Sequence, residues 1–389
     1  MQNEIYLDNS ATTPVAEEVV QAMEPYWSVQ YGNPSSPHLR GVAAEKTMGS
    51  CRDQLAQLLD VHPSELYFTP SGTVANNLAL LGTANTPYFT RSPGHIITTP
   101  IEHASVLNTV KHLKGRGWAV SLLDVDGHGA IEPEQIKDLI QPDTKLVSVM
   151  HVNNELGTIA PIKEISRLLQ AENEKRRHKI VFHVDAVQAL GNVPLNPAVL
   201  GVDTMSFSGH KIFGPKGIGL LYVGRNTRLE PLFFGGSQER GLWPGTENVP
   251  GIVGFTRAAQ LAVANLEANV SHMQDLRREL LEGITAIEGA KIHNPPAGAP
   301  HILNVGFAGV RGEVLVHFLE QKRIFVAMGA ACSAKRRGLS HVLRAVGLRD
   351  EEILGAVRIS LSHQLSLDQI KYVVYSLKET VEEIRNIYM

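Results

Sequence analysis

The sequence predicts an α/β protein with a mostly parallel central sheet, helices on both faces of that sheet, and a second, smaller α/β domain. Three observations predict this fold class. Short apolar runs alternate with longer stretches of helical period, as in repeated β–α–β units. The runs at 146–150 and 180–182 are almost continuously apolar, as expected of strands covered on both faces. After Gly251 a long helical stretch and a Pro-rich break replace this rhythm.

The individual elements follow from the same patterns. We expect strands at residues 66–68, 95–98, 119–123, 145–150, 180–184, 204–207 and 218–223. Helices are expected at 43–59, 104–114, 132–140 and 162–175, and helical period continues from Gly251 to about residue 287. The last helix has one apolar face, formed by Leu367, Ile370, Val374, Leu377, Val381, Ile384 and Tyr388. That face predicts a packing role and no chemistry.

Length and composition exclude several classes of protein. The 389 residues allow two or three domains, and the net charge of -3 gives no overall attraction to nucleic acid or anionic lipid. With only two cysteines, Cys51 and Cys332, a reducing compartment is favoured and a cysteine zinc cluster is excluded. No signal-peptide pattern or membrane-length apolar run occurs. We therefore expect a soluble cytoplasmic protein with no membrane or direct nucleic-acid partner.

Polar residues directly after the predicted strands are the first candidates for a site, because ligands of open α/β sheets bind at the carboxyl ends of strands. Gly72 and Thr73 stand where a tight turn opens into a helix, which suits a phosphate group but also occurs in ordinary loops. His103 follows the strand at 95–98. It could stack on a planar cofactor or move protons, although a lone histidine at such a junction is more often a helix cap.

Asp185 and Lys211 carry more specific signals. An aspartate at the mouth of a buried strand needs a cationic partner, which a protonated ring nitrogen, a basic side chain or a helix N-terminus could supply. Lys211 lies between a strand and a Gly-Pro turn, with Ser208 and His210 just before it. An amine held in a partly desolvated cleft is what Schiff-base formation requires, whereas a surface position is the usual setting of a single lysine.

The motifs in which these residues stand resemble those of the pyridoxal-phosphate cysteine desulfurases of the NifS/IscS type. The resemblance rests on the segments 6–14, 31–36, 185–188, 206–211 and 245–248, and it extends from about residue 5 to about residue 365. It implies a fold-type-I homodimer with active sites at the subunit interface. It also implies a large cofactor-binding domain at 16–255 and a small domain formed by 1–15 and 256–389.

The resemblance implies a role for each matching residue. Lys211 would bind pyridoxal 5'-phosphate covalently and remove the α-proton of L-cysteine, while Asp185 would pair with the ring nitrogen and Gln188 with the ring oxygen. His103 would stack on the ring and shuttle a proton. The phosphate would be held by Gly72, Thr73, Ser208, His210 and the Thr246 of the partner subunit, and the substrate by Arg358, Asn154 and Asn33. No metal site is expected.

Cys332 matches the nucleophile of this family. It lies among small residues followed by Lys335, Arg336 and Arg337, a setting that suits an exposed thiol with thiolate character. The resemblance implies that Cys332 takes the substrate sulfur as a persulfide and passes it to an acceptor protein, such as an iron-sulfur scaffold or a tRNA-thiolation relay. Cys51 stands on a helical stretch and is predicted to pack in the core.

Two departures and three alternatives accompany this interpretation. Val74 replaces the usual glutamate of the family, and Trp243 and Pro244 replace an arginine and a small residue. An aminotransferase or a selenocysteine lyase would share Asp185 and Lys211, but a transaminase would not need Cys332. A non-catalytic sulfur-carrier subunit would lack the cofactor. A metal hydrolase is disfavoured because the HExxH pattern is absent.

Overall fold

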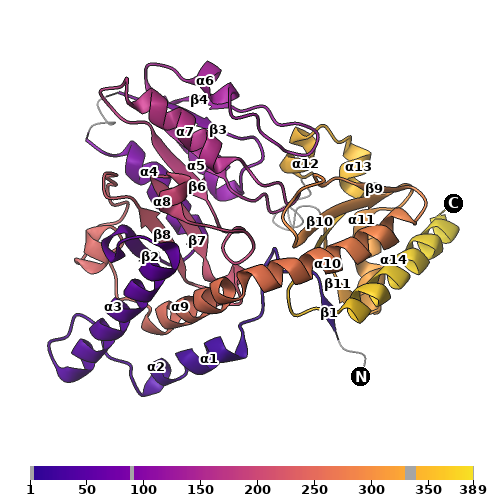
Figure 1. The fold of residues 1–389 in the computed structure, drawn as a ribbon, viewed down its shortest axis with the longest axis horizontal. Helices are drawn as coiled ribbons and strands as arrows, with labels where there is room; N and C mark the ends of the chain where they lie inside the picture. The colour runs from indigo at the N-terminus through magenta and orange to yellow at the C-terminus, as the bar shows by residue number, and fades with distance from the viewer. Residues whose placement is uncertain (1–3, 88–91, 329–338, 389) are drawn as a thin grey trace.

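The computed structural model describes residues 4–87, 92–328 and 339–388. Its strands form a seven-stranded sheet, a four-stranded sheet and a two-stranded sheet. Figure 1 shows the large sheet and its helices on one side, the smaller sheets on the other, and two consecutive helices running between them. These helices are α9 (Val249–Ala264) and α10 (Leu266–Thr285), and they account for the predicted long helical stretch.

The large sheet is mostly parallel, as predicted. Its strand order is β2-β8-β7-β6-β5-β3-β4, and β8 runs in the direction opposite to that of the other six strands. The seven predicted strands are confirmed to within one residue at each end. They are β2 (Leu66–Thr69), β3 (His95–Thr98), β4 (Ala119–Leu122), β5 (Thr144–Met150), β6 (Val181–Asp185), β7 (Thr204–Ser208) and β8 (Gly219–Val223).

Helices cover both faces of this sheet. On one face α4 (Gly72–Ala84) and α5 (Ala104–Gly115) pack on the strands, and their buried residues include Leu80, Val106 and Leu113. On the other face lie α3 (Leu39–Leu59), α7 (Ile162–Asn173) and α9, with Phe182 and Phe207 of the strands in the same core. Short helices complete this part of the chain: α1 (Glu17–Met23), α2 (Pro25–Ser28), α6 (Gln135–Leu139) and α8 (Pro197–Leu200).

The helices predicted here are confirmed, with differences at some of their ends. Helix α3 begins at Leu39 and not at residue 43, and α7 ends at Asn173 and not at residue 175. Helix α6 begins at Gln135 and not at residue 132, because residues 133–134 form a turn before it. Cys51 lies in α3 with 6% of its surface exposed and contributes to the core, so its predicted packing role is confirmed. Among the described residues, none of the helices combines the length and the apolar character that crossing a membrane requires.

The smaller unit is built on the antiparallel sheet β12-β13-β10-β9. The C-terminal helix α14 (Leu367–Tyr388) buries Ile370, Leu377, Val381 and Ile384 against α10 and this sheet. The remaining elements are β9 (Ala290–Ile292), β10 (Ile302–Phe307), α11 (Gly312–Gln321), β11 (Ile324–Phe325), β12 (Ala327–Met328), α12 (His341–Ala345), α13 (Asp350–Gly355) and β13 (Ala356–Ser360). Its core is separate from that of the large sheet.

The N-terminal segment connects the two units. Strand β1 (Ile5–Tyr6) pairs with β11, and Asp8 forms a bridge with Ser360 of β13. A few residues later the Thr13 N–H donates to the His210 carbonyl, 2.9 Å away, beside the large sheet. This segment therefore crosses directly in front of the carboxyl ends of the parallel strands. The predicted domain boundaries at 15/16 and 255/256 remain a prediction, and the second of them falls within α9.

Candidate active site

The carboxyl ends of β2, β3, β5, β6 and β7 bring most of the predicted site residues to one edge of the large sheet. Gly72 follows β2, His103 follows β3, Asn154 follows β5, Asp185 ends β6, and Lys211 follows β7. Because parallel strands end at the same edge, residues far apart in the sequence meet there. The small unit adds Arg358 from β13.

Asp185 is buried, with 4% of its surface exposed, and both of its carboxylate oxygens accept hydrogen bonds. The Asn76 side-chain amide donates to Oδ2 at 2.7 Å, and the Val187 backbone N–H donates to Oδ1 at 3.0 Å. These two donors fix the plane of the carboxylate at the mouth of the sheet.

His103 caps α5 and stands close to both Asp185 and Lys211. Its Nδ1 accepts from the Ser105 N–H at 3.1 Å, which makes it the N-cap of the helix. Burial lowers the pKa of His103, the negative charge of Asp185 opposes that shift, and the charge of Lys211 adds to it. The ring is therefore neutral near pH 7 while it remains within electrostatic reach of both charged groups.

Lys211 ends a single 3-10 turn that follows β7. Its Nζ donates to the carbonyl oxygens of Ser10 and Ala11, at 2.5 and 2.8 Å. The Gln188 side-chain amide donates to the same Ser10 oxygen at 2.9 Å. The amine and the amide therefore meet at the N-terminal segment. Two residues beyond Lys211, Phe213 has a φ of 61°, a left-handed conformation that is strained for a bulky residue and fixes this turn.

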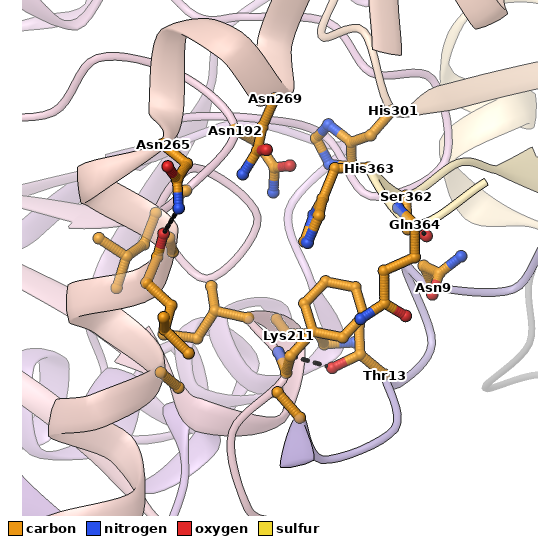
Figure 2. Close-up of a pocket in the computed structure, with 18 of the residues that line it drawn as sticks. Asn9, Thr13, Asn192, Lys211, Asn265, Asn269, His301, Ser362, His363 and Gln364 are labelled. Atoms are coloured by element: carbon orange, nitrogen blue, oxygen red, sulfur yellow. Dashed lines mark hydrogen bonds between the residues drawn. The ribbon is translucent and has the colours of Figure 1, made fainter. Parts of the chain in front are cut away.

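A cavity of about 200 Å³ with both polar and apolar lining residues lies beside Lys211. Figure 2 shows Lys211 and Thr13 on one side of the cavity, and Asn192, Asn265, Asn269, His301 and His363 around the rest of it. These residues come from both units of the chain. Lys211 is therefore placed at the junction of the two units, where a ligand can contact both.

The first turn of α4 offers a place for an anion. Ser71 caps the helix by accepting the Val74 N–H at 3.2 Å, and Gly72 packs against the strand ends. A Cβ atom at Gly72 would lie 2.7 Å from Val187 and 3.3 Å from the Ser208 Cβ, so only glycine fits. Thr73 is exposed on the same turn. Free N–H groups and the helix dipole there suit a phosphate.

His210 stands beside Lys211 and takes no positive charge near neutral pH. Its Nδ1 lies 3.1 Å from the Thr12 hydroxyl. Burial lowers the pKa of His210 to about 4, and the charges of Lys211 and Lys216 add to the effect. It can therefore donate one hydrogen bond to an anion but not a full charge.

Arg358 is buried on β13, with its guanidinium pointing to the end of β5. Its Nη2 donates to Asp8 at 2.7 Å, and its Nη1 donates to the backbone carbonyl of Asn154 at 3.0 Å. Its side chain is 3% exposed, and that of Asp8 is 23% exposed. Within the described residues its Nε has no hydrogen-bond partner. The site therefore holds an oriented cation with donor capacity left over.

Two predicted residues, Asn33 and Thr246, lie away from this cluster, and a third is not described. Asn33 is exposed in the loop between α2 and α3, at the lower left of Figure 1, where its side chain accepts from the Ser35 N–H. Thr246 is exposed beside Pro70, in a separate small pocket. Cys332 lies outside the described residues. The structure therefore brings Lys211, the predicted residues around it and Arg358 to one place. Within one chain, Asn33 and Thr246 do not reach that place.

The sequence reasoning missed Asn76, Ser105 and Asp8, which contact the predicted residues Asp185, His103 and Arg358 in turn. It also missed His183, which contacts Asn76. Two of them had a signal. Asn76 lies four residues after Gly72 and so on the same face of α4, and His183 lies two residues before Asp185 and so on the same face of β6.

Comparison with known proteins gives the class first. The model of the aminotransferase class-V family matches residues 5–373, so the chain belongs to this family of pyridoxal-phosphate-dependent enzymes. Within it the chain belongs to the cysteine desulfurases. The cysteine desulfurase IscS of Methanosarcina thermophila is 40% identical over 384 residues, which cover 98% of this chain and 93% of that protein.

Solved structures agree with this placement. A NifS-like protein superposes with a TM-score of 0.91 at 38% identity, and the match covers 98% of this chain and 100% of that protein. SspA, solved in complex with cysteine, superposes with a TM-score of 0.80 at 35% identity, covering 92% of this chain and 99% of that chain. The predicted fold class and the predicted family are confirmed.

Proposed function

We propose that this chain binds pyridoxal 5'-phosphate and converts L-cysteine to L-alanine, leaving the sulfur as a persulfide on Cys332. The observation that carries the proposal is the grouping of Lys211, the buried carboxylate of Asp185 and the neutral His103 at one sheet edge. The solved complex of SspA with cysteine supports the choice of substrate.

The residues present fit this cofactor. The Asp185 carboxylate is fixed on both oxygens and so offers a directed negative partner for a ring nitrogen. Ser206, next to Asp185 in the sheet, has a buried Oγ with no hydrogen-bond partner among the described residues. Gly72 leaves room only for backbone against Ser208, which permits close approach of a phosphate. Gln188 would hold the ring oxygen, and Lys211 would bind the aldehyde carbon.

When bound, pyridoxal phosphate supplies an electron sink for the negative charge that develops at the substrate Cα. The protein positions the groups around that carbon. Arg358, oriented by Asp8 and by the Asn154 carbonyl, binds the substrate carboxylate. Lys211 takes the proton from Cα. Its amine lines the cavity at the junction of the two units, where the substrate would lie. The neutral His103 is the proton shuttle for the substrate thiol: its ring N–H first gives its proton to the substrate, and the freed nitrogen then accepts the proton of the thiol.

The sulfur transfer is a nucleophilic displacement. The Cys332 thiolate attacks the substrate sulfur, so that an S–S bond forms while the bond between sulfur and the substrate Cβ breaks. The electron pair of the broken bond takes up a proton, and alanine leaves. One cysteine and one enzyme thiol therefore give one alanine and one persulfide. An acceptor protein of iron-sulfur cluster assembly or tRNA thiolation then removes the sulfur.

We also propose that the enzyme is a homodimer in which Thr246 completes the phosphate site of the partner. Large apolar side chains are exposed near it, which supports such an interface: Phe233 and Phe234, at 56% and 88%, belong to the same stretch of chain, and the Phe233 ring packs edge-on against Trp243. Light scattering should give twice the chain mass, and Phe234→Asp should shift the protein toward monomer. A wild-type monomer would contradict this proposal.

The test of the activity starts from the absorbance spectrum of the purified protein. Wild type should carry bound pyridoxal phosphate and, with L-cysteine and a thiol reductant, should release alanine and sulfide in equal amounts. Lys211→Ala should lose both products. Cys332→Ala should retain the cofactor and lose sulfide release, whereas the matched variant Cys51→Ala should retain both. A colourless protein, or full sulfide release by Cys332→Ala, would refute the proposal.

A further inference from the structure

We propose that Asn76 is a positioning residue for the cofactor ring: its one amide holds Asp185 and, through Ser105, His103 in the relative placement that a pyridine ring needs. The inference deepens the proposed function and rests on it. Asn76 lies on α4, directly beneath the strand ends, and 1% of its surface is exposed.

All hydrogen-bonding groups of the Asn76 side chain that face the site are engaged. Its Nδ2 donates to Asp185 Oδ2 at 2.7 Å and to Ser105 Oγ at 2.9 Å. Its Oδ1 lies 3.0 Å from His183 Nε2. One amide hydrogen thus goes to the first turn of α5, and the other goes to the last residue of β6. The Asn76 side chain therefore fixes the distance between α5 and β6 as well as the orientation of the Asp185 carboxylate.

The direction of the hydrogen bonds follows from the chemistry of the groups. A carboxamide oxygen only accepts, so His183 Nε2 must carry the hydrogen. Burial lowers the pKa of His183 to about 3, so the ring is neutral and its Nδ1 carries none. That nitrogen therefore accepts from the Thr204 hydroxyl, 2.9 Å away. Donors point in one direction, from Thr204 through His183 and Asn76 to the Asp185 carboxylate.

The second branch reaches His103. Because Ser105 Oγ accepts from Asn76, its own hydrogen is left for His103 Nδ1 at 2.8 Å. The Ser105 backbone N–H donates to the same nitrogen at 3.1 Å. His103 Nδ1 is thus an acceptor twice over, and the hydrogen of the neutral ring is on Nε2. One amide therefore orients both the partner of the ring nitrogen and the ring that would stack on the cofactor.

The structure predicts what Asn76→Leu does. Leucine has a similar volume but no donor, so Asp185 keeps only the Val187 N–H and its carboxylate can turn. A hydrogen bond to a charged group contributes about 10- to 100-fold to a binding constant. The variant should therefore lose about tenfold of the preference for a cofactor that has the ring nitrogen over one that lacks it. A loss of packing alone would weaken any ligand of the same shape equally.

The experiment uses this difference on the full-length, cofactor-free protein. Dissociation constants are measured for pyridoxal phosphate and for its 1-deaza analogue, in which a C–H replaces the ring nitrogen. Wild type should prefer the natural cofactor by about tenfold or more, and Asn76→Leu and Asn76→Ala should lose most of that preference. Thr83→Val is the matched control, because Thr83 is buried on the same helix and its hydroxyl donates only to the Ala79 carbonyl. It should retain the preference.

The outcomes separate the two proposals. If wild type binds neither compound, the proposed function fails. If wild type prefers the pyridine and the Asn76 variants keep that preference, only the role of Asn76 is refuted. Nitrogen-15 NMR of the cofactor-free protein gives a readout that does not depend on the cofactor: His183 should show a neutral ring with hydrogen on Nε2. Hydrogen on Nδ1 would refute the direction of the hydrogen-bond chain.

Discussion

The pair formed by Arg358 and Asp8 allows the most detailed prediction. The Nη2–Oδ1 distance is 2.7 Å, the arginine side chain is 3% exposed and the aspartate side chain is 23% exposed. Removing one partner of a fully buried pair costs about 3–5 kcal/mol, and surface pairs contribute about 0–1 kcal/mol. Since one partner here is buried and the other is partly hydrated, we expect a coupling free energy of about 2 kcal/mol.

A double-mutant cycle measures this coupling directly. Urea unfolding of wild type, Asp8→Asn, Arg358→Gln and the double variant, all without cofactor, gives the interaction free energy. The same variants test the substrate role, because Arg358→Gln should raise the KM for L-cysteine by about tenfold or more through loss of a charge-assisted bond. A coupling below about 0.5 kcal/mol would show that the pair does not orient the arginine.

Three further predictions concern stability and cofactor binding. Burial raises the pKa of Glu102 to about 8. The folded protein therefore holds a proton that the unfolded chain loses above pH 4.5. Between pH 5 and 8, the free energy of unfolding of wild type should fall by at least about 1 kcal/mol relative to that of Glu102→Gln, which urea unfolding measures. A pH-independent difference would contradict the raised pKa. Arg52→Met should lower the free energy of unfolding by about 3 kcal/mol, because it leaves the Glu239 side chain, which is 3% exposed, without its cationic partner. An unchanged urea midpoint would contradict this prediction. Gly72→Ala should weaken cofactor binding by about tenfold or more, since its Cβ would lie 2.7 Å from Val187, and unchanged binding in a titration would contradict the tight fit.

Much of the fold could be predicted from the sequence, because strands buried on both faces must be short apolar runs. Thr144–Met150 and Val181–Asp185 show this pattern and were placed to within one residue. The prediction for helix α6 is too long, because the helix has a single buried residue, Ile136, and so gives little periodic signal. The bridge between Asp8 and Ser360 could not be predicted, because it depends on how the N-terminal segment crosses between the units.

The candidate site was predicted in part for a similar reason. Residues at strand ends, such as Asp185 and Lys211, share one edge of a parallel sheet, so topology alone places them together. Asn76 and Ser105 lie on helices that cover the sheet, and their contacts depend on how each helix is rotated and packed. The sequence pattern shows only the face on which such a residue stands, not the atom that its amide reaches.

The most direct test of the central claim is the mass of the enzyme after a single turnover. Cofactor-loaded protein is mixed with less than one equivalent of L-cysteine in the absence of reductant, alkylated, digested and analysed by mass spectrometry. The proposed function predicts the mass of one added sulfur atom on the peptide that contains Cys332, none on the peptide with Cys51, and one alanine for each sulfur transferred. Alanine formed without sulfur on Cys332 would contradict the account.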